Sequence, residues 1–158
     1  MPDHVILAAG PSLADATYET RYAATRAVSR AIAAPLAVED MVVQAMPDTS
    51  PTKWHLAHVT WFFETFVLAR FVPGYRCFDA DYAFLFNSYY EGAGDRHARP
   101  ERGLITRPTV AEVLDYRDYV DAAMAGLLAE VLDNAEVAQL VELGINHEQQ
   151  HQELMLMD

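Results

Sequence analysis

The chain has 158 residues, of which 52% are hydrophobic, and its formal net charge of -12 argues against nucleic acid or an anionic membrane as a partner. The length suits a single domain, residues 1–158, with one core of ordinary size. The only cysteine, Cys77, excludes an internal disulfide, and no signal peptide or apolar run of roughly 18 residues is visible, so we expect a cytoplasmic protein that does not cross a membrane.

The first predicted helix covers residues 13–34, where apolar positions recur with helical spacing. Ser12 is its candidate N-cap, and Pro35 follows its end. A shorter helix is expected over residues 38–46, before Pro47. Proline does not continue a helix, so each proline sets the end of the segment before it.

A second long helix is expected over residues 52–72, with Ser50 as its cap and Pro51 at its first position. It is too apolar for a surface helix, so we expect it to lie deep in the fold. Residues 74–108 form a long irregular connection rich in aromatic residues, glycine, proline and arginine, with a short helix expected within residues 79–90. Connections of this length are usually functional or disordered, and the aromatic content argues against disorder.

Two more long helices follow. Thr109 and Glu112 have the spacing of a capping box, which begins a helix that runs to about residue 132. Asn134 is the candidate N-cap of a last helix over residues 135–157. Four long helices with one long connection between the second and third predict an all-α fold, an antiparallel four-helix bundle.

Histidines on two of these helices are candidate metal ligands. His147 and His151 in "NHEQQH" lie four residues apart, so both face the same side of a helix. Such a pair alone more often has no metal, but "WHLAH" places His58 on the apolar second helix, where a buried imidazole needs a polar partner. Three histidines from two helices would leave coordination positions open, as in catalytic sites. We expect His55 to be exposed rather than to support this site.

The same segment matches His-Glu-x-x-His, the zinc metalloprotease motif in which Glu148 would be the general base. A protease needs a third ligand, usually downstream, and few residues remain after His151. No strand pattern provides a sheet edge to align a peptide. The sequence therefore disfavours a protease.

Arginines gather in the irregular connection. Arg96, Arg99 and Arg102 suit bidentate recognition of carboxylates, the alternative being a solvated loop in which they offset neighbouring acids. Tyr89 and Tyr90 could line a pocket or stack on a ring, although packing is the commoner role of tyrosine at such positions. The connection is therefore a candidate substrate-binding segment.

Three stretches, in this order, resemble the N-terminal part of the ergothioneine-biosynthesis sulfoxide synthases: "SPTKWHLAHVTWFFET", "FLFNSYYEGAGDRHARPERGLITRPTV" and "GINHEQQHQELMLMD". The resemblance covers nearly the whole chain from about residue 17. It implies a DinB-like four-helix bundle. In the family a C-terminal domain similar to formylglycine-generating enzyme follows and supplies a catalytic tyrosine, and we expect that this domain is missing here.

The resemblance also implies non-haem Fe(II) held by three histidines, here His58, His147 and His151. Gln150 falls where the family contacts hercynine through its imidazole. Arg99, with Arg96 or Arg102 as alternates, falls in the region that binds the carboxylates of the thiol substrate. The implied assignment thus uses both the last helix and the arginine-rich connection.

The implied reaction uses O2 to join the thiol of γ-glutamylcysteine or cysteine to the imidazole of hercynine and to oxidise the sulfur to a sulfoxide. Without the second domain, we expect the chain to bind Fe(II) with little or no turnover. A DinB-like thiol transferase or hydrolase using Zn(II) or Ni(II) is the second hypothesis, since three imidazoles suit several metals. A non-catalytic bundle whose histidines only pack is the third.

Overall fold

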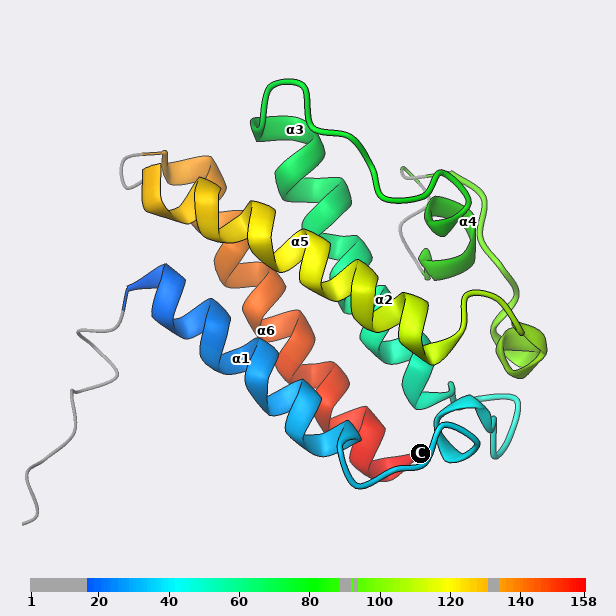
Figure 1. Ribbon diagram of the computed structural model, residues 1–158. Helices are drawn as coiled ribbons and strands as arrows, with labels where there is room; N and C mark the ends of the chain where they lie inside the picture. Colours follow the sequence, from blue (N-terminus) through cyan, green and yellow to red (C-terminus); the bar gives the residue numbers. More distant parts are fainter. Residues whose placement is uncertain (1–16, 89–91, 93, 131–133) are drawn as a thin grey trace, which may run out of the picture.

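The computed structural model describes residues 17–88, 92, 94–130 and 134–158, and these form helices and irregular segments with no strand among them. The four long helices lie side by side (Figure 1), and α1 packs against α6 while α2 packs against both α5 and α6. Their bounds are α1 Tyr18–Ala33, α2 Thr52–Phe63, α5 Val110–Glu130 and α6 Ala135–Met157. The all-helical prediction is confirmed for the described residues. Within them, no helix combines the length and apolar character needed to cross a membrane.

The N-terminal part of the fold follows the sequence prediction only partly. Thr17 caps α1 by accepting a hydrogen bond from the backbone N–H of Thr20 at 3.3 Å, whereas the predicted cap, Ser12, lies outside the described residues. The helix expected over residues 38–46 is wrong, because only η2 (Asp40–Val42) forms there, as a short 3-10 helix. Val42 and Val43 are β-branched, poor helix formers, and the chain is extended at Val43.

The second long helix lies deep in the fold, as predicted. Pro51 occupies its N-cap rather than its first helical position, and every residue of α2 after Thr52 is buried. The helix continues through the π-helical η3 (Glu64–Leu68) and α3 (Ala69–Phe71). An interior helix of this kind carries any polar side chain into the core, where that side chain needs a partner.

The connection between α3 and α5 is tied to the beginning of α2. It contains α4 (Tyr82–Phe86) and the 3-10 helix η5 (Arg99–Leu104). The buried ammonium of Lys53 donates to the carbonyls of Ile105 at 2.7 Å and Pro108 at 2.8 Å. The indole N–H of Trp54 donates to the carbonyl of Leu85 at 3.0 Å. The connection is thereby held over the N-terminal half of α2.

Local signals set the beginnings of α5 and α6 as predicted. Glu112 accepts from the backbone N–H of Thr109 at 2.6 Å, and its own N–H donates to the Thr109 hydroxyl at 3.2 Å, which is a capping box. The Asn134 side chain accepts from two N–H groups of α6, at 3.0 and 3.2 Å. Within α6, a Cβ atom at Gly144 would lie 2.4 Å from a ring carbon of Phe63, so this glycine permits close approach of α6 to α2.

Candidate metal centre

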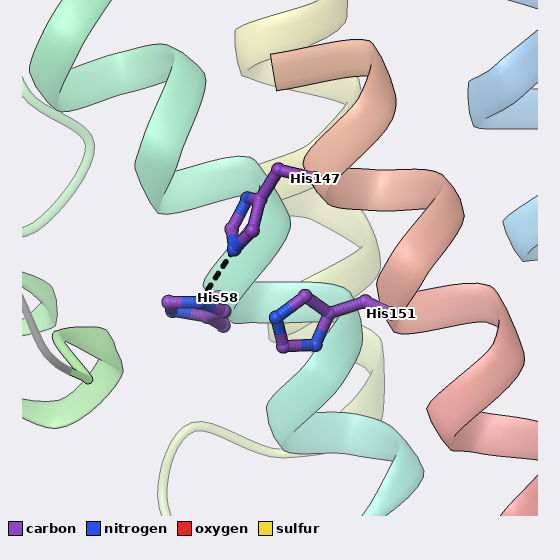
Figure 2. A group of neighbouring side chains, drawn as sticks. All are labelled: His58, His147 and His151. Carbon is purple, nitrogen blue, oxygen red and sulfur yellow. Dashed lines mark hydrogen bonds between the residues drawn. The ribbon is translucent and has the colours of Figure 1, made fainter. Parts of the chain in front are cut away.

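Close packing of α2 and α6 brings three histidines together. His58 from α2 faces His147 and His151 from α6 (Figure 2), and one ligand atom from each can be chosen so that all lie within 4.8 Å of one another. The Nε2 atoms of His58 and His147 are 3.1 Å apart. The two α6 histidines share a face because they lie one turn apart. The structure therefore assembles the predicted three-histidine group.

The tautomer of His58 follows from its hydrogen bond. Its Nδ1 lies 2.6 Å from the carbonyl oxygen of Phe86, at the end of α4, so Nδ1 carries the proton and donates. The Nε2 atom then keeps its lone pair, and this atom faces His147. Trp54 stacks on the His58 ring with centroids 4.5 Å apart and an interplanar angle of 13°. A backbone acceptor and an aromatic face thus fix the ring with Nε2 directed at the other imidazoles.

Burial keeps these imidazoles neutral. It lowers the pKa of His147 to about 4. Burial, reinforced by the neighbouring imidazoles, also lowers the pKa of His58 and of His151 well below the usual value. Neutral imidazoles offer lone pairs, and a metal ligand must be deprotonated. Three neutral nitrogen donors with converging positions, one of them on the half-buried His147, therefore fit a divalent transition metal, and the set does not select one metal over another.

Glu148 is turned away from this group. It is 0% exposed, and its carboxylate accepts from Ser29 at 2.6 Å, Arg26 at 3.0 Å and Arg117 at 3.1 Å. Burial alone would raise its pKa, but the two guanidinium groups hold the pKa of Glu148 at about 2. A carboxylate bound by three donors in the core is not placed to act as a general base at the metal. The position of Glu148 therefore argues against a zinc protease, which needs this residue as its general base.

A cavity of about 280 Å³ opens beside the three histidines. Gln150 and Arg99 lie on its wall, Gln150 exposed and Arg99 half-buried. Arg102 also lines it but is only 3% exposed, and its guanidinium carbon lies 3.4 Å from the centroid of the Trp54 ring. Its terminal nitrogens donate to serine hydroxyls at 2.9 and 3.1 Å. The guanidinium groups of Arg99 and Arg102 and the amide of Gln150 therefore line the same cavity as the three candidate metal ligands.

The remaining predicted residues lie elsewhere. Arg96 is exposed, donates to the carbonyl of Ser88 at 2.5 Å and lines a neighbouring hollow together with Arg99 and Arg102. Tyr89 and Tyr90 lie outside the described residues. Of the three arginines considered from the sequence, the structure thus brings Arg99 and Arg102 to the histidines and leaves Arg96 to one side.

Comparison with protein families agrees with this architecture. Residues 21–155 match the model of the DinB superfamily. The chain belongs to the DinB superfamily. Domains of this kind often bind a metal, which agrees with the three-histidine group. A search of curated proteins found no match, so the superfamily is the level at which the comparisons place the chain.

Sequence reasoning missed two residues of this DinB-superfamily site. His55, expected to be exposed, is 2% exposed, and its Nδ1 lies 2.7 Å from Nδ1 of His151. Its Nε2 lies 3.0 Å from a carboxylate oxygen of Asp158, and burial lowers the pKa of His55. A signal was present: His55 precedes His58 by three residues on a strongly apolar helix, so the two share a face. Asp158 had no such signal, since its proximity arises from tertiary packing.

Proposed function

We propose that the chain is the Fe(II)-binding domain of an oxygenase that joins hercynine to γ-glutamylcysteine or cysteine and oxidises the sulfur, as in ergothioneine biosynthesis. The observation that carries the proposal is the convergence of three neutral imidazoles on a cavity that also holds Arg99, Arg102 and Gln150. Superfamily membership supports the metal. The resemblance of three sequence stretches to the ergothioneine-biosynthesis sulfoxide synthases supports the specific reaction.

We propose that the scaffold is a four-helix bundle of α1, α2, α5 and α6, in which the two histidine-bearing helices, α2 and α6, run in opposite directions. In support, α1 contacts α6 and α5, and α2 contacts α5 and α6. In the ribbon view α1 and α6 run in one direction and α2 and α5 in the opposite one (Figure 1), and Arg21 pairs with Glu142 as Arg26 pairs with Glu148 further along both helices. The neighbours α1 and α6 are therefore parallel, so a fully antiparallel order is wrong. Bundles commonly build metal sites from side chains on facing helices, and here α2 and α6 are those helices.

His58, His147 and His151 are the proposed ligands. Because all three are neutral, they leave the positive charge of Fe(II) undiminished, and the ion would supply activation of dioxygen and attraction for a thiolate. Three protein ligands leave further coordination positions open to substrates. The chain's own contribution is to hold the rings in fixed orientations within a core that excludes bulk water from one side of the site.

Arg99 is the proposed anchor for the carboxylates of the thiol substrate. It is half-buried on the cavity wall, where a ligand can reach it, whereas Arg102 lies beneath the surface between Trp54 and two serine hydroxyls. Arg102 would add positive potential rather than a direct contact. A guanidinium pairs with a carboxylate in a two-pronged geometry, which fixes orientation as well as affinity.

Gln150 is the proposed contact for the imidazole of hercynine. It lies one residue before His151 and lines the same cavity, so a group bound by its amide is close to the ligand set. The overall reaction balances with one O2: the thiol and the imidazole carbon each lose a hydrogen, one oxygen atom enters the sulfoxide, and the other leaves as water. Holding both substrates at one site replaces a chance encounter by positioning.

Anaerobic titration of tag-free protein with Fe(II), Zn(II) and Ni(II), followed by calorimetry with hercynine and each thiol, tests the proposal. His58→Ala should abolish metal binding. Arg99→Ala should weaken binding of γ-glutamylcysteine roughly 10- to 100-fold, the value of a charged hydrogen-bonded contact, without changing metal affinity. The matched control is Arg107→Ala, an exposed arginine outside the cavity.

Two results would contradict the proposal in different ways. Absence of metal binding would favour a bundle whose histidines only pack. Metal binding without any affinity for hercynine would favour a thiol transferase or hydrolase. In the family that the chain resembles, the catalytic tyrosine belongs to a second domain, so residues 1–158 tested by themselves should show little or no oxygen consumption; robust turnover would show that this tyrosine is not required.

A further inference from the structure

We propose that His55 and Asp158 act as positioning residues that hold the ring of His151 with Nε2 directed at the metal. The inference rests on the proposed metal centre and adds two residues that neither the motifs nor the resemblance assigns. It concerns how one ligand is oriented, so it can fail while the metal centre stands.

A chain of hydrogen bonds carries the inference. The carboxylate of Asp158 can only accept, so Nε2 of His55, 3.0 Å away, must carry a proton and donate to it. In a neutral imidazole the other nitrogen is then an acceptor. Nδ1 of His151, 2.7 Å from Nδ1 of His55, must therefore donate to it. The remaining nitrogen of His151, Nε2, keeps its lone pair for a metal.

The carboxylate at the end of this chain is itself held in place. The backbone N–H of Ser50 donates to the same Asp158 oxygen at 3.1 Å, and the N–H of Asp158 donates to the carbonyl of Leu154 at 2.9 Å. Ser50 precedes α2, and Asp158 follows α6. The hydrogen bonds therefore join the ends of the two ligand-bearing helices as well as orienting the ring.

His58 has a similar hydrogen-bonding arrangement, which supports the positioning role proposed for His55. There the outer N–H donates to a backbone carbonyl, that of Phe86, at 2.6 Å. Metal-ligating histidines usually donate their second N–H to a carbonyl or carboxylate, which fixes the tautomer and raises the basicity of the ligand. His151 has the same arrangement with His55 inserted before the carboxylate. Unlike a backbone carbonyl, this partner can be removed by substitution.

His55 is not placed to be a ligand in its own right. Both its ring nitrogens are engaged, one with Asp158 and one with His151. Among the described residues, the group whose ligand atoms can share one ion consists of His58, His147 and His151. Its hydrogen bonds are therefore consistent with a residue that supports a metal ligand and does not bind the metal itself.

Co(II) titration of the full chain provides the test. His55→Ala should lower Co(II) affinity about 10- to 100-fold, the usual cost of removing such a partner. His55→Asn places an amide oxygen near the position of Nδ1, so it can still accept from His151 and should retain most of the affinity. His55→Gln reaches only the position of Nε2 and should behave like His55→Ala. His97→Ala, a histidine outside this cavity, is the control.

Proton NMR of the Co(II) protein gives a readout that loss of packing alone would not reproduce. The paramagnetically shifted ring N–H signals of His58 and His151 should both be protected from solvent. In His55→Ala and His55→Gln the His151 signal should be lost by exchange while the His58 signal stays, and Asp158→Asn should weaken protection less than His55→Ala.

The possible results distinguish failure of the proposed positioning role from failure of the proposed metal centre. If wild-type protein binds no Co(II), the metal centre fails and the inference fails with it. If wild type binds Co(II) and His55→Ala binds it equally with both N–H signals retained, the positioning role is wrong while the metal centre stands. Should His55→Ala fold poorly, the comparison of the asparagine and glutamine variants decides, and equal affinity in these two would overturn the inference.

Discussion

Replacing Glu148 by glutamine tests whether the acidic residue of the His-Glu-x-x-His segment stabilises the fold or takes part in chemistry. The carboxylate is 0% exposed and accepts from Arg26, Ser29 and Arg117, which come from α1 and α5. Glutamine keeps the shape and one acceptor but removes the charge. Two guanidinium groups would then share the core without their common counter-charge.

The expected loss of unfolding free energy is about 3 kcal/mol. Removal of one partner from a buried ion pair typically costs about 3–5 kcal/mol, and the retained amide oxygen places glutamine at the lower end. The lowering of the Glu148 pKa from 4.5 to about 2 corresponds to a similar value, about 3 kcal/mol. Because this pKa is lower in the folded state, the contribution is present above about pH 4.5 and is lost as the pH falls towards 2.

Urea unfolding at pH 7, followed by circular dichroism, measures the difference. The matched control is Glu142→Gln on the same helix, where Arg21 donates at 2.6 and 2.7 Å to a carboxylate that is 37% exposed; this variant should lose less than about 1 kcal/mol. The difference between wild type and Glu148→Gln should shrink at acid pH. A variant as stable as wild type at pH 7 would refute the reasoning and reopen a chemical role for Glu148.

Three further predictions follow from the packing and the site. Gly144→Ala should destabilise the fold by about 1–3 kcal/mol, since its Cβ would lie 2.4 Å from a ring carbon of Phe63, whereas Gly126→Ala, with open space around it, should be neutral or stabilising in a parallel unfolding experiment. Metal at about 100 times its dissociation constant should stabilise the protein by about 2.7 kcal/mol, and a chelator should reverse the shift in the unfolding midpoint. Co(II) should quench tryptophan emission, because two indole rings stack on His58 at 4.5 and 5.7 Å; unchanged emission at saturation would place the ion elsewhere.

Local signals made much of the site predictable. Caps at Thr109 and Asn134 depend on residues two or three positions away, so the beginnings of α5 and α6 could be read without knowledge of the fold. The pairing of His147 with His151 is likewise a property of helix geometry. The choice of His58 needed one step more, the inference that an apolar helix would face the last one.

Contacts between distant segments were not predictable in the same way. His55 and Asp158 are 103 residues apart, and their hydrogen bond exists because the end of α6 reaches the beginning of α2. The partners of Glu148 on α1 and α5 have no spacing in the sequence that links them to it. The helix expected over residues 38–46 fails for a different reason, since the adjacent valines there have low helix propensity and the chain is extended at Val43.

Glu148 and its neighbours on α6 explain how one short segment serves both stability and metal binding. Successive helical residues are rotated by about 100°, and Glu148, directly after His147, points into the core rather than to the cavity wall. The helix therefore directs His147 and His151 at α2 and Glu148 into the core between α1 and α5. Because the ion pairs of Glu148 hold the turn that carries both histidines, the anchorage that stabilises the fold also sets the separation of the ligands. A metal site of this kind requires a rigid support, and here the support is an interior salt-bridge cluster rather than apolar packing alone.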